Sequence, residues 1–161
     1  MKFAIKMALA NKKNVDLIQE INRLRKEKNK GELEIVIATT PMALLGVFDS
    51  KNDRIFLSNR LGILTASSTI YHELIHAYDH ENGGDISLMK NRVCTEIRAY
   101  SISEAYFGIF NRKKKRVGKM AARTLDSVYK NLETDGNKDE NLLEMKKLIL
   151  RSMKNCYKNK N

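Results

Sequence analysis

The three histidines of the chain all fall between residues 72 and 80, and the spacing of two of them could perform chemistry. His72 and His76 frame a glutamate, Glu73, in the order His-Glu-x-x-His. Because four residues advance an α-helix by slightly more than one turn, the two imidazoles would lie on one face of a helix. Two imidazoles placed in this way can bind one Zn²⁺, with Zn–N distances of about 2.0–2.1 Å. The spacing therefore predicts a metal site made by His72 and His76.

Glu73 follows the first predicted ligand, and we expect it beside the metal rather than bound to it. A carboxylate in this position can act as a general base that takes a proton from a water molecule activated by the metal. The alternative is an ordinary buried helix with two hydrogen-bonded histidines, which leaves the glutamate and the spacing unexplained. The motif predicts a hydrolytic site with one Zn²⁺ per chain and Glu73 as its catalytic residue.

The flanking sequence favours a helix for this motif. Thr65, Ser67 and Ser68 are candidate N-caps, and Gly83-Gly84 is a natural stop. Apolar residues recur at helical spacing on two neighbouring stripes, which is typical of a buried helix. These stripes are formed by Ile70, Leu74 and Ala77 and by Tyr71, Ile75 and Tyr78.

Three short apolar segments before the motif predict a small β-sheet. The first is expected over residues 33–38, after a helix over residues 14–28. Two further strands, over residues 46–49 and 54–58, flank the turn-rich residues 50–53, which predicts a hairpin. An edge strand beside a metal-binding helix could pair with an extended peptide through backbone hydrogen bonds.

The chain beyond the motif is predicted to be helical, and it is rich in basic residues. Helices are expected over residues 87–103, 117–132 and 139–157, and the length of 161 residues predicts one domain, 1–161. The formal net charge is +11, and residues 111–161 contain 15 Lys and Arg against 6 Asp and Glu. Such a segment could contact an anionic membrane, bind nucleic acid or form a solvated helical surface. No nucleic-acid-binding motif accompanies it, so no specific nucleic acid is predicted.

Two motifs taken together resemble a known family. The run His-Glu-Leu-Ile-His-Ala-Tyr-Asp-His over residues 72–80, followed by Cys-Thr-Glu-Ile-Arg-Ala over residues 94–99, is similar to the mitochondrial inner-membrane metalloproteases that process ATP-synthase subunit 6. Animal members of that family are also called Ku-binding proteins. The resemblance implies a zinc endopeptidase on the intermembrane-space side of the mitochondrial inner membrane. It also implies a chaperone-like role in ATP-synthase assembly, with a hydrophobic membrane subunit as partner.

The chain departs from the family at several positions. The family is rich in cysteine, but Ser58, Glu81 and Tyr106 stand where cysteines are usual, and Glu104 replaces a usual glycine. The lost cysteines count against oxidative import into the intermembrane space. They leave the residues of the zinc motif unchanged.

The third protein ligand must come from outside the motif, because a catalytic zinc ion takes three protein ligands and keeps one position for water. His80 lies about 9 Å further along the helix axis than the expected metal, so it could bind only if the helix broke after Tyr78. Glu96 follows His76 by 20 residues on a separate predicted helix, the arrangement of gluzincin peptidases, and it matches the family's Glu-Ile-Arg-Ala motif. We expect Glu96 as the third ligand; the alternative is a surface carboxylate or one paired with Arg98.

These features together predict an α+β fold of the zincin-like, gluzincin type. A small N-terminal β-sheet with the motif helix would precede a mostly helical C-terminal half. The predicted activity is zinc-dependent metalloendopeptidase. The alternatives are an assembly chaperone with little or no proteolysis and, ranked lower, a DNA-associated metalloprotease. Side chains expected near the ligands without binding the metal are Asp79, Arg98 and Tyr100.

The two cysteines, Cys94 and Cys156, lie in no zinc-ligand spacing. They could form one disulfide in an oxidising compartment or stay reduced elsewhere. A disulfide between them would tie the last predicted helix to the one that carries Glu96, and closing this loop is worth about 4–5 kcal/mol in the chain-entropy model.

Overall fold

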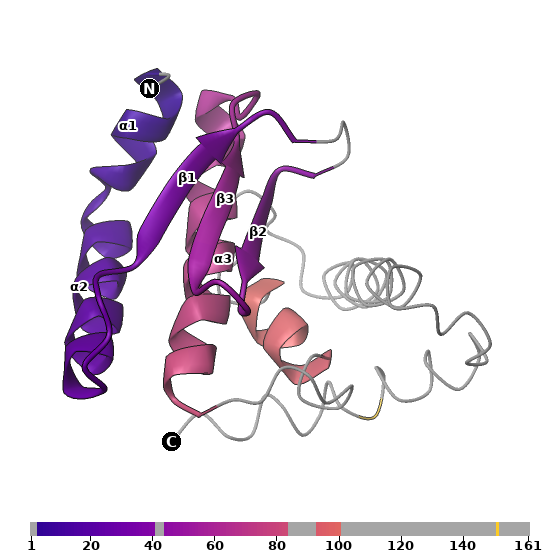
Figure 1. Ribbon diagram of the computed structural model, residues 1–161. Helices are drawn as coiled ribbons and strands as arrows, with labels where there is room; N and C mark the ends of the chain where they lie inside the picture. Colours follow the sequence, from indigo (N-terminus) through magenta and orange to yellow (C-terminus); the bar gives the residue numbers. More distant parts are fainter. Residues whose placement is uncertain (1–2, 41–43, 84–92, 101–150, 152–161) are drawn as a thin grey trace. The chain divides into compact units, whose positions relative to one another are not determined.

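The computed structural model describes residues 3–40, 44–83, 93–100 and 151 (Figure 1). The chain divides into two compact units, residues 1–84 and 85–161. The described part of the first unit contains helices α1 (Phe3–Leu9), α2 (Lys12–Glu27) and α3 (Ile63–Glu81) and strands β1 (Glu34–Ala38), β2 (Gly46–Asp49) and β3 (Arg54–Ser58). In the second unit residues 93–100 are helical. The described residues form an α+β fold, as predicted, while the prediction of a single domain stays a prediction.

The predicted helices over residues 117–132 and 139–157, and the basic segment 111–161 apart from Arg151, lie outside the described residues. Within the part of the chain that the structure describes, no helix is both long and apolar enough to cross a membrane.

The sheet has the strand order β1-β3-β2. β1 pairs with β3 in parallel, and β2 pairs with β3 in antiparallel fashion, with Gly46 opposite Leu57 and Asp49 opposite Arg54. The predicted hairpin of β2 and β3 is therefore confirmed. β3 is the central strand, and its Ile55 and Leu57 are almost fully buried. Among the described strands, β2 forms one edge of the sheet.

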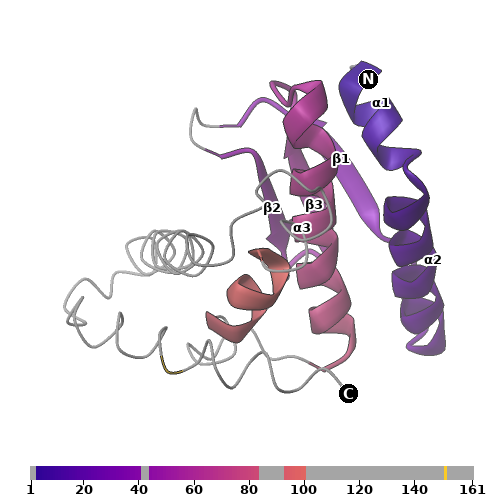
Figure 2. The same ribbon diagram turned by 180° about the vertical axis from the view of Figure 1, so that it is seen from behind.

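Helix α3 packs against one face of the sheet, with α1 and α2 beside it (Figures 1 and 2). In Figure 1 the helix lies behind the strands, and in Figure 2 it lies in front of them. The predicted stripe of Ile70, Leu74 and Ala77 is buried, and Ile5 of α1 and Ile21 of α2 are fully buried as well. The packing explains why α3 is apolar around much of its circumference.

The start of α3 differs from the prediction. Gly62 is the N-cap, and the helix begins at Ile63, before the three predicted N-caps. Thr65 and Ser68 do not cap, because they lie inside the helix, where their hydroxyl groups donate back to the carbonyl oxygens of Gly62 and Thr65. The end was predicted better: Asn82 is the C-cap, and Gly83 follows with a φ of 82°. That left-handed conformation favours glycine.

The N-terminal part of the chain also differs from the prediction. Helix α1 was not predicted, and α2 begins at Lys12, because the side chain of Asn11 caps it by accepting a hydrogen bond from Lys13 N at 3.1 Å. The two helices are joined by buried Asn14, whose Nδ2 donates to Ala8 O at 2.7 Å. This bond satisfies a carbonyl at the end of α1.

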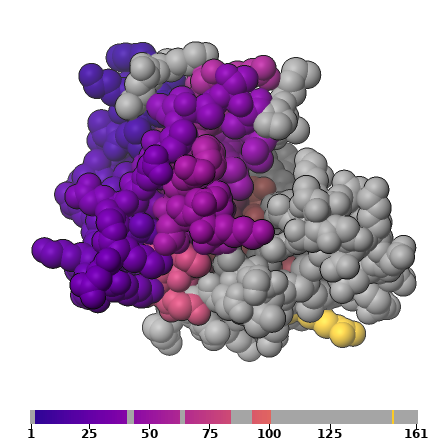
Figure 3. Space-filling model, viewed as in Figure 1, coloured from indigo at the N-terminus to yellow at the C-terminus, as the bar shows by residue number. Residues whose placement is uncertain are grey.

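An ion-pair cluster ties the ends of α2 and α3 to the turn between β2 and β3. It consists of Arg25, Lys28, Lys30, Asp53, His80 and Glu81. The Glu81 side chain is 1% exposed, and Oε1 lies 2.9 Å from Arg25 Nη1 and 3.2 Å from Lys30 Nζ. Lys30 Nζ also lies 3.0 Å from Asp53 Oδ2. In the space-filling view the end of α3 emerges beside the segment that follows α2 (Figure 3).

The cations of this cluster keep both of its carboxylates ionised. Burial by itself would raise the pKa of Glu81, but hydrogen bonds from Lys30 and Lys28 and the charges of Lys30 and Arg25 outweigh it and hold that pKa below its ordinary value. Burial likewise opposes ionisation of Asp53, and the hydrogen bond and charge of Lys30, with the nearby charge of Arg25, again give a lowered pKa.

Candidate metal centre

His72 and His76 lie on one face of α3 and present their ring nitrogens to each other. The two Nε2 atoms are 3.0 Å apart, and the half-buried rings meet edge to face with centroids 4.7 Å apart. Two Zn–N bonds of about 2.0–2.1 Å can span up to about 4 Å, so this separation is compatible with both nitrogens binding one ion. The helical spacing of the motif therefore produces the arrangement of nitrogens that the sequence predicted.

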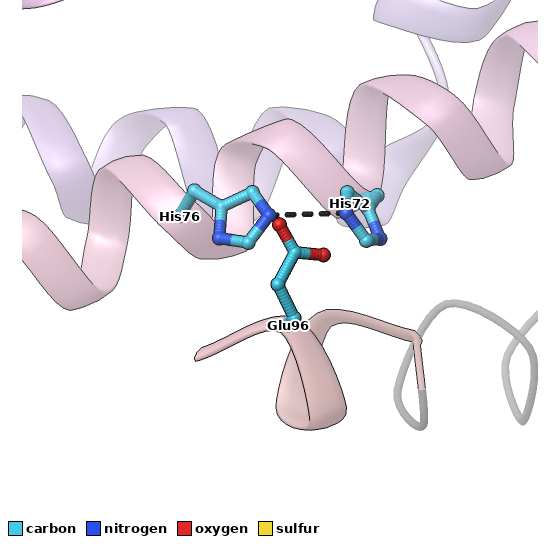
Figure 4. Close-up of side chains that lie close together, drawn as sticks. All are labelled: His72, His76 and Glu96. Atoms are coloured by element: carbon cyan, nitrogen blue, oxygen red, sulfur yellow. Dashed lines mark hydrogen bonds between the residues drawn. The ribbon is translucent and has the colours of Figure 1, made fainter. Parts of the chain in front are cut away.

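The buried carboxylate of Glu96 completes a group of three candidate ligands (Figure 4). Two imidazoles and one carboxylate form a donor set that suits Zn²⁺ and leaves a fourth position for water. Binding of a metal by these residues stays a prediction.

Glu73 points from α3 toward strand β2. It is 7% exposed, and its Oε2 accepts a hydrogen bond from the backbone N–H of Phe48 at 2.9 Å. β2 can approach the helix this closely because Gly46 has no side chain: a Cβ there would lie 2.9 Å from Cγ of Glu73 and 2.9 Å from Cγ2 of Thr69. The carboxylate of the motif is therefore held by a strand as well as by its own helix.

The third histidine has a different environment. Helix α3 continues through Tyr78 to Glu81, so the break that His80 would need to reach the metal is absent from this helix. His80 Nε2 lies 3.1 Å from Oδ1 of Asp53, and its ring lies against the ring of Phe48, with centroids 5.5 Å apart. His80 thus joins the ion-pair cluster to the strand that holds Glu73.

The atoms of a second group of potential ligands, from Asp53, His80 and Glu81, lie within 4.8 Å of one another. Its two carboxylates already face cations, since Arg25 and Lys30 each lie within 4.0 Å of both. A metal ion there would have to displace or repel these positive charges. The group is therefore an ion-pair cluster rather than a metal site.

The residues expected around the ligands are spread over two elements. Asp79 is buried on α3, whereas Arg98 is exposed and Tyr100 is half-buried on residues 93–100. Their expected roles stay predictions. Cys94 is disulfide-bonded, whereas the sequence left a disulfide and two reduced cysteines open; Cys156 lies outside the described residues.

Sequence reasoning missed two residues near Glu73, Gly46 and Phe48. The sequence placed both in a strand, as observed, but gave no reason to place that strand against the motif glutamate. A glycine inside a strand often marks a place where another group approaches closely, and Gly46 was such a signal. Phe48 acts through its backbone, so no feature of its side chain could have indicated the bond.

A model of the peptidase M76 family matches residues 3–161, which is nearly the whole chain. No curated protein and no solved structure shows a significant match.

Proposed function

The chain belongs to the peptidase M76 family, a family of metallopeptidases, and from this premise we propose that it is a zinc-dependent metalloendopeptidase with a zincin-like, gluzincin-type fold. The observation that carries the proposal is the geometry on α3. His72 and His76 bring their Nε2 atoms to 3.0 Å from each other, and Glu96 is the third member of this group of candidate ligands. Glu73 lies beside them on the same helix.

In this proposal His72, His76 and Glu96 bind the metal, and Glu73 transfers the proton of the attacking water. A zinc ion so held would supply a Lewis acid that polarises the scissile carbonyl and lowers the pKa of a water molecule toward about 7. Glu73 takes the proton of the attacking water on its carboxylate and later gives it to the leaving amine. The bond from Phe48 N–H to Oε2 fixes one oxygen of this carboxylate, so the orientation of the other is set too.

The neighbouring strand supports a peptide as substrate. β2 is an edge strand of the described sheet, and an extended peptide can pair with such an edge through backbone hydrogen bonds. Because the N–H of Phe48 is bonded to Glu73, the peptide would pair with the backbone at the start of β2, next to Gly46, and would leave that bond intact. Leu44 and Leu45, directly before β2, are 37% and 44% exposed. They favour a substrate with apolar side chains next to the paired segment.

The test compares purified, zinc-loaded wild type with Glu73→Gln. The variant should bind zinc with unchanged stoichiometry and lose peptide hydrolysis, because an amide cannot accept the proton. Wild type treated with a chelator should also lose activity and regain it when zinc is added. Hydrolysis by Glu73→Gln at the wild-type rate would refute the assignment of Glu73.

By resemblance, we further propose that the substrate is a hydrophobic membrane subunit, as for the proteases that process ATP-synthase subunit 6, at the intermembrane-space side of the mitochondrial inner membrane. The chain lacks two family cysteines within the described residues: Ser58 is buried, and Glu81 belongs to the ion-pair cluster. Protease treatment of isolated mitochondria tests this location. The protein should be degraded once the outer membrane is opened and survive while it is intact.

A second candidate function is an assembly chaperone for such a subunit. The observation that favours it is the exposed pair Leu44 and Leu45 beside the edge strand, because apolar surface can hold an apolar client. Expression of Glu73→Gln in cells that lack the protein separates the two. Full rescue supports the chaperone, and no rescue supports the peptidase.

A further inference from the structure

We propose that strand β2 positions the carboxylate of Glu73, and that Gly46 is the positioning residue that makes this possible. The inference rests on the proposed function, in which Glu73 moves the proton. It concerns a separate matter, namely which residues outside the zinc motif fix the orientation of that carboxylate. Gly46 and Phe48 belong to β2, and neither is part of the His-Glu-x-x-His pattern.

The N–H of Phe48 points away from the neighbouring strand β3, toward the free edge of β2. Ser58 N donates to Leu45 O at 2.9 Å, so Leu45 and Ser58 form a hydrogen-bonded pair of the antiparallel ladder. Such pairs alternate with pairs that exchange no hydrogen bonds. Because Phe48 is three positions further along and faces Ile55, it belongs to the second kind, and its N–H is directed outward. There it meets Glu73 Oε2 at 2.9 Å, a bond outside the sheet ladder.

Gly46 lies two residues earlier on the same strand. It determines how closely β2 can approach α3. A Cβ at Gly46 would lie 2.9 Å from Cγ of Glu73, 2.9 Å from Cγ2 of Thr69 and 3.2 Å from Oε1 of Glu73. Contacts below 3.0 Å are too short for carbon atoms, so any side chain here must push the glutamate or the strand away. Both side chains lie on α3, and they are separated by one helical turn. Gly46 therefore fits between them.

The turn end of the strand is anchored independently. The ring of Phe48 lies against the ring of His80 at 5.5 Å, and His80 Nε2 lies 3.1 Å from Asp53 Oδ1 in the turn between β2 and β3. Lys30 Nζ holds the same Asp53 side chain at 3.0 Å. The strand is thus fixed to α3 and to the segment that follows α2, so it cannot easily shift when a side chain is added at position 46. The glutamate has to move.

The first experiment tests the hydrogen bond between the Phe48 amide and Glu73 without measuring activity. Hydrogen exchange of the Phe48 amide is followed by NMR in wild type and in Glu73→Ala, with the Val47 amide, which faces β3, as the internal reference. The Phe48 amide should exchange at least about tenfold faster in Glu73→Ala, while the Val47 amide keeps its protection. Equal protection of Phe48 in both proteins would show that Glu73 does not hold this amide and would overturn the proposal.

The second experiment measures the catalytic effect of position 46. Gly46→Ala should lower kcat by about 10–100-fold, because a small misplacement of a catalytic group has an effect of this size. KM should stay within about twofold, and zinc affinity should not change. Gly31→Ala is the matched control, since a Cβ there meets nothing within 4 Å. Wild-type kcat in folded Gly46→Ala would overturn the proposal.

A rescue separates positioning from a general loss of stability. Thr69→Ser removes Cγ2, one of the two carbon atoms that would lie 2.9 Å from a Cβ at position 46. The double variant Gly46→Ala with Thr69→Ser should recover part of kcat, and a double variant no better than Gly46→Ala would count against the proposal. If wild type hydrolyses no peptide, the proposed function fails, and the exchange of the Phe48 amide still decides whether β2 holds Glu73.

Discussion

Replacement of Glu81 by glutamine tests the ion-pair cluster that fixes the end of α3. The change keeps the volume of the side chain and removes a charge that is 1% exposed and faces Arg25, Lys28 and Lys30. Removal of one partner from a buried ion pair costs about 3–5 kcal/mol, because the other charge stays buried without compensation. Two features reduce this cost here. Lys28 and Lys30 are 44% and 32% exposed and can turn to water, and Asp53 still faces Arg25 at 3.7 Å. We expect a loss of about 2–3 kcal/mol in the free energy of unfolding at pH 7.

The dependence of this loss on pH provides a second check. The pKa of Glu81 in the folded protein is lowered from its ordinary value of 4.5, so its contribution is present above that pH and disappears as the pH falls through the folded-state pKa. Urea unfolding of wild type and Glu81→Gln, followed by circular dichroism, should therefore give a difference that is largest at neutral pH and shrinks below about pH 4.5. Glu20→Gln is the control, because Glu20 pairs with Arg23 on the exposed surface and should show no measurable loss. A difference below about 0.5 kcal/mol at pH 7, or one that persists undiminished in acid, would refute the reasoning.

Three further predictions follow from other parts of the molecule. Glu96→Ala should weaken zinc binding, measured by competition with a chelator, by more than the 10–100-fold typical of a residue that only orients a ligand; unchanged affinity would eliminate Glu96 as a ligand. Leu74→Ala, at a fully buried position of α3, should lower the free energy of unfolding by about 2–5 kcal/mol in urea titrations. Asn11→Ala removes the N-cap of α2 and should cost about 1 kcal/mol in the same assay; Asn11→Gly should cost only a few tenths.

The local elements were predictable because each is encoded by neighbouring residues. The strands over residues 46–49 and 54–58 were predicted with the bounds observed, since a turn-rich loop between two apolar runs is a short-range signal. The face shared by His72 and His76 follows from helix geometry alone. Short-range rules failed at the start of α3, where Thr65 and Ser68 bond back to carbonyl oxygens instead of capping.

Interactions between distant segments could not be predicted in the same way. Glu81 reads as a surface residue near a helix end, yet it is buried because Arg25, 56 residues earlier, reaches it from α2. The bond between Phe48 and Glu73 depends on the distance between a strand and a helix, which no periodicity encodes. The parallel pairing of β1 with β3 was not predicted either, because the chain first passes to the edge of the sheet as β2 and then returns to the centre.

The short edge strand also affects how the protein behaves at high concentration. Outward-facing N–H and C=O groups of an edge strand can recruit an extended segment of another molecule, and this is a common route to aggregation. β2 has only four residues, and the N–H of Phe48 is already bonded to Glu73 of its own chain. A second copy that added a strand here would have to break that bond and leave a buried carboxylate without its donor. The hydrogen bond that orients Glu73 therefore also keeps the sheet from growing into the ladders from which fibres are built.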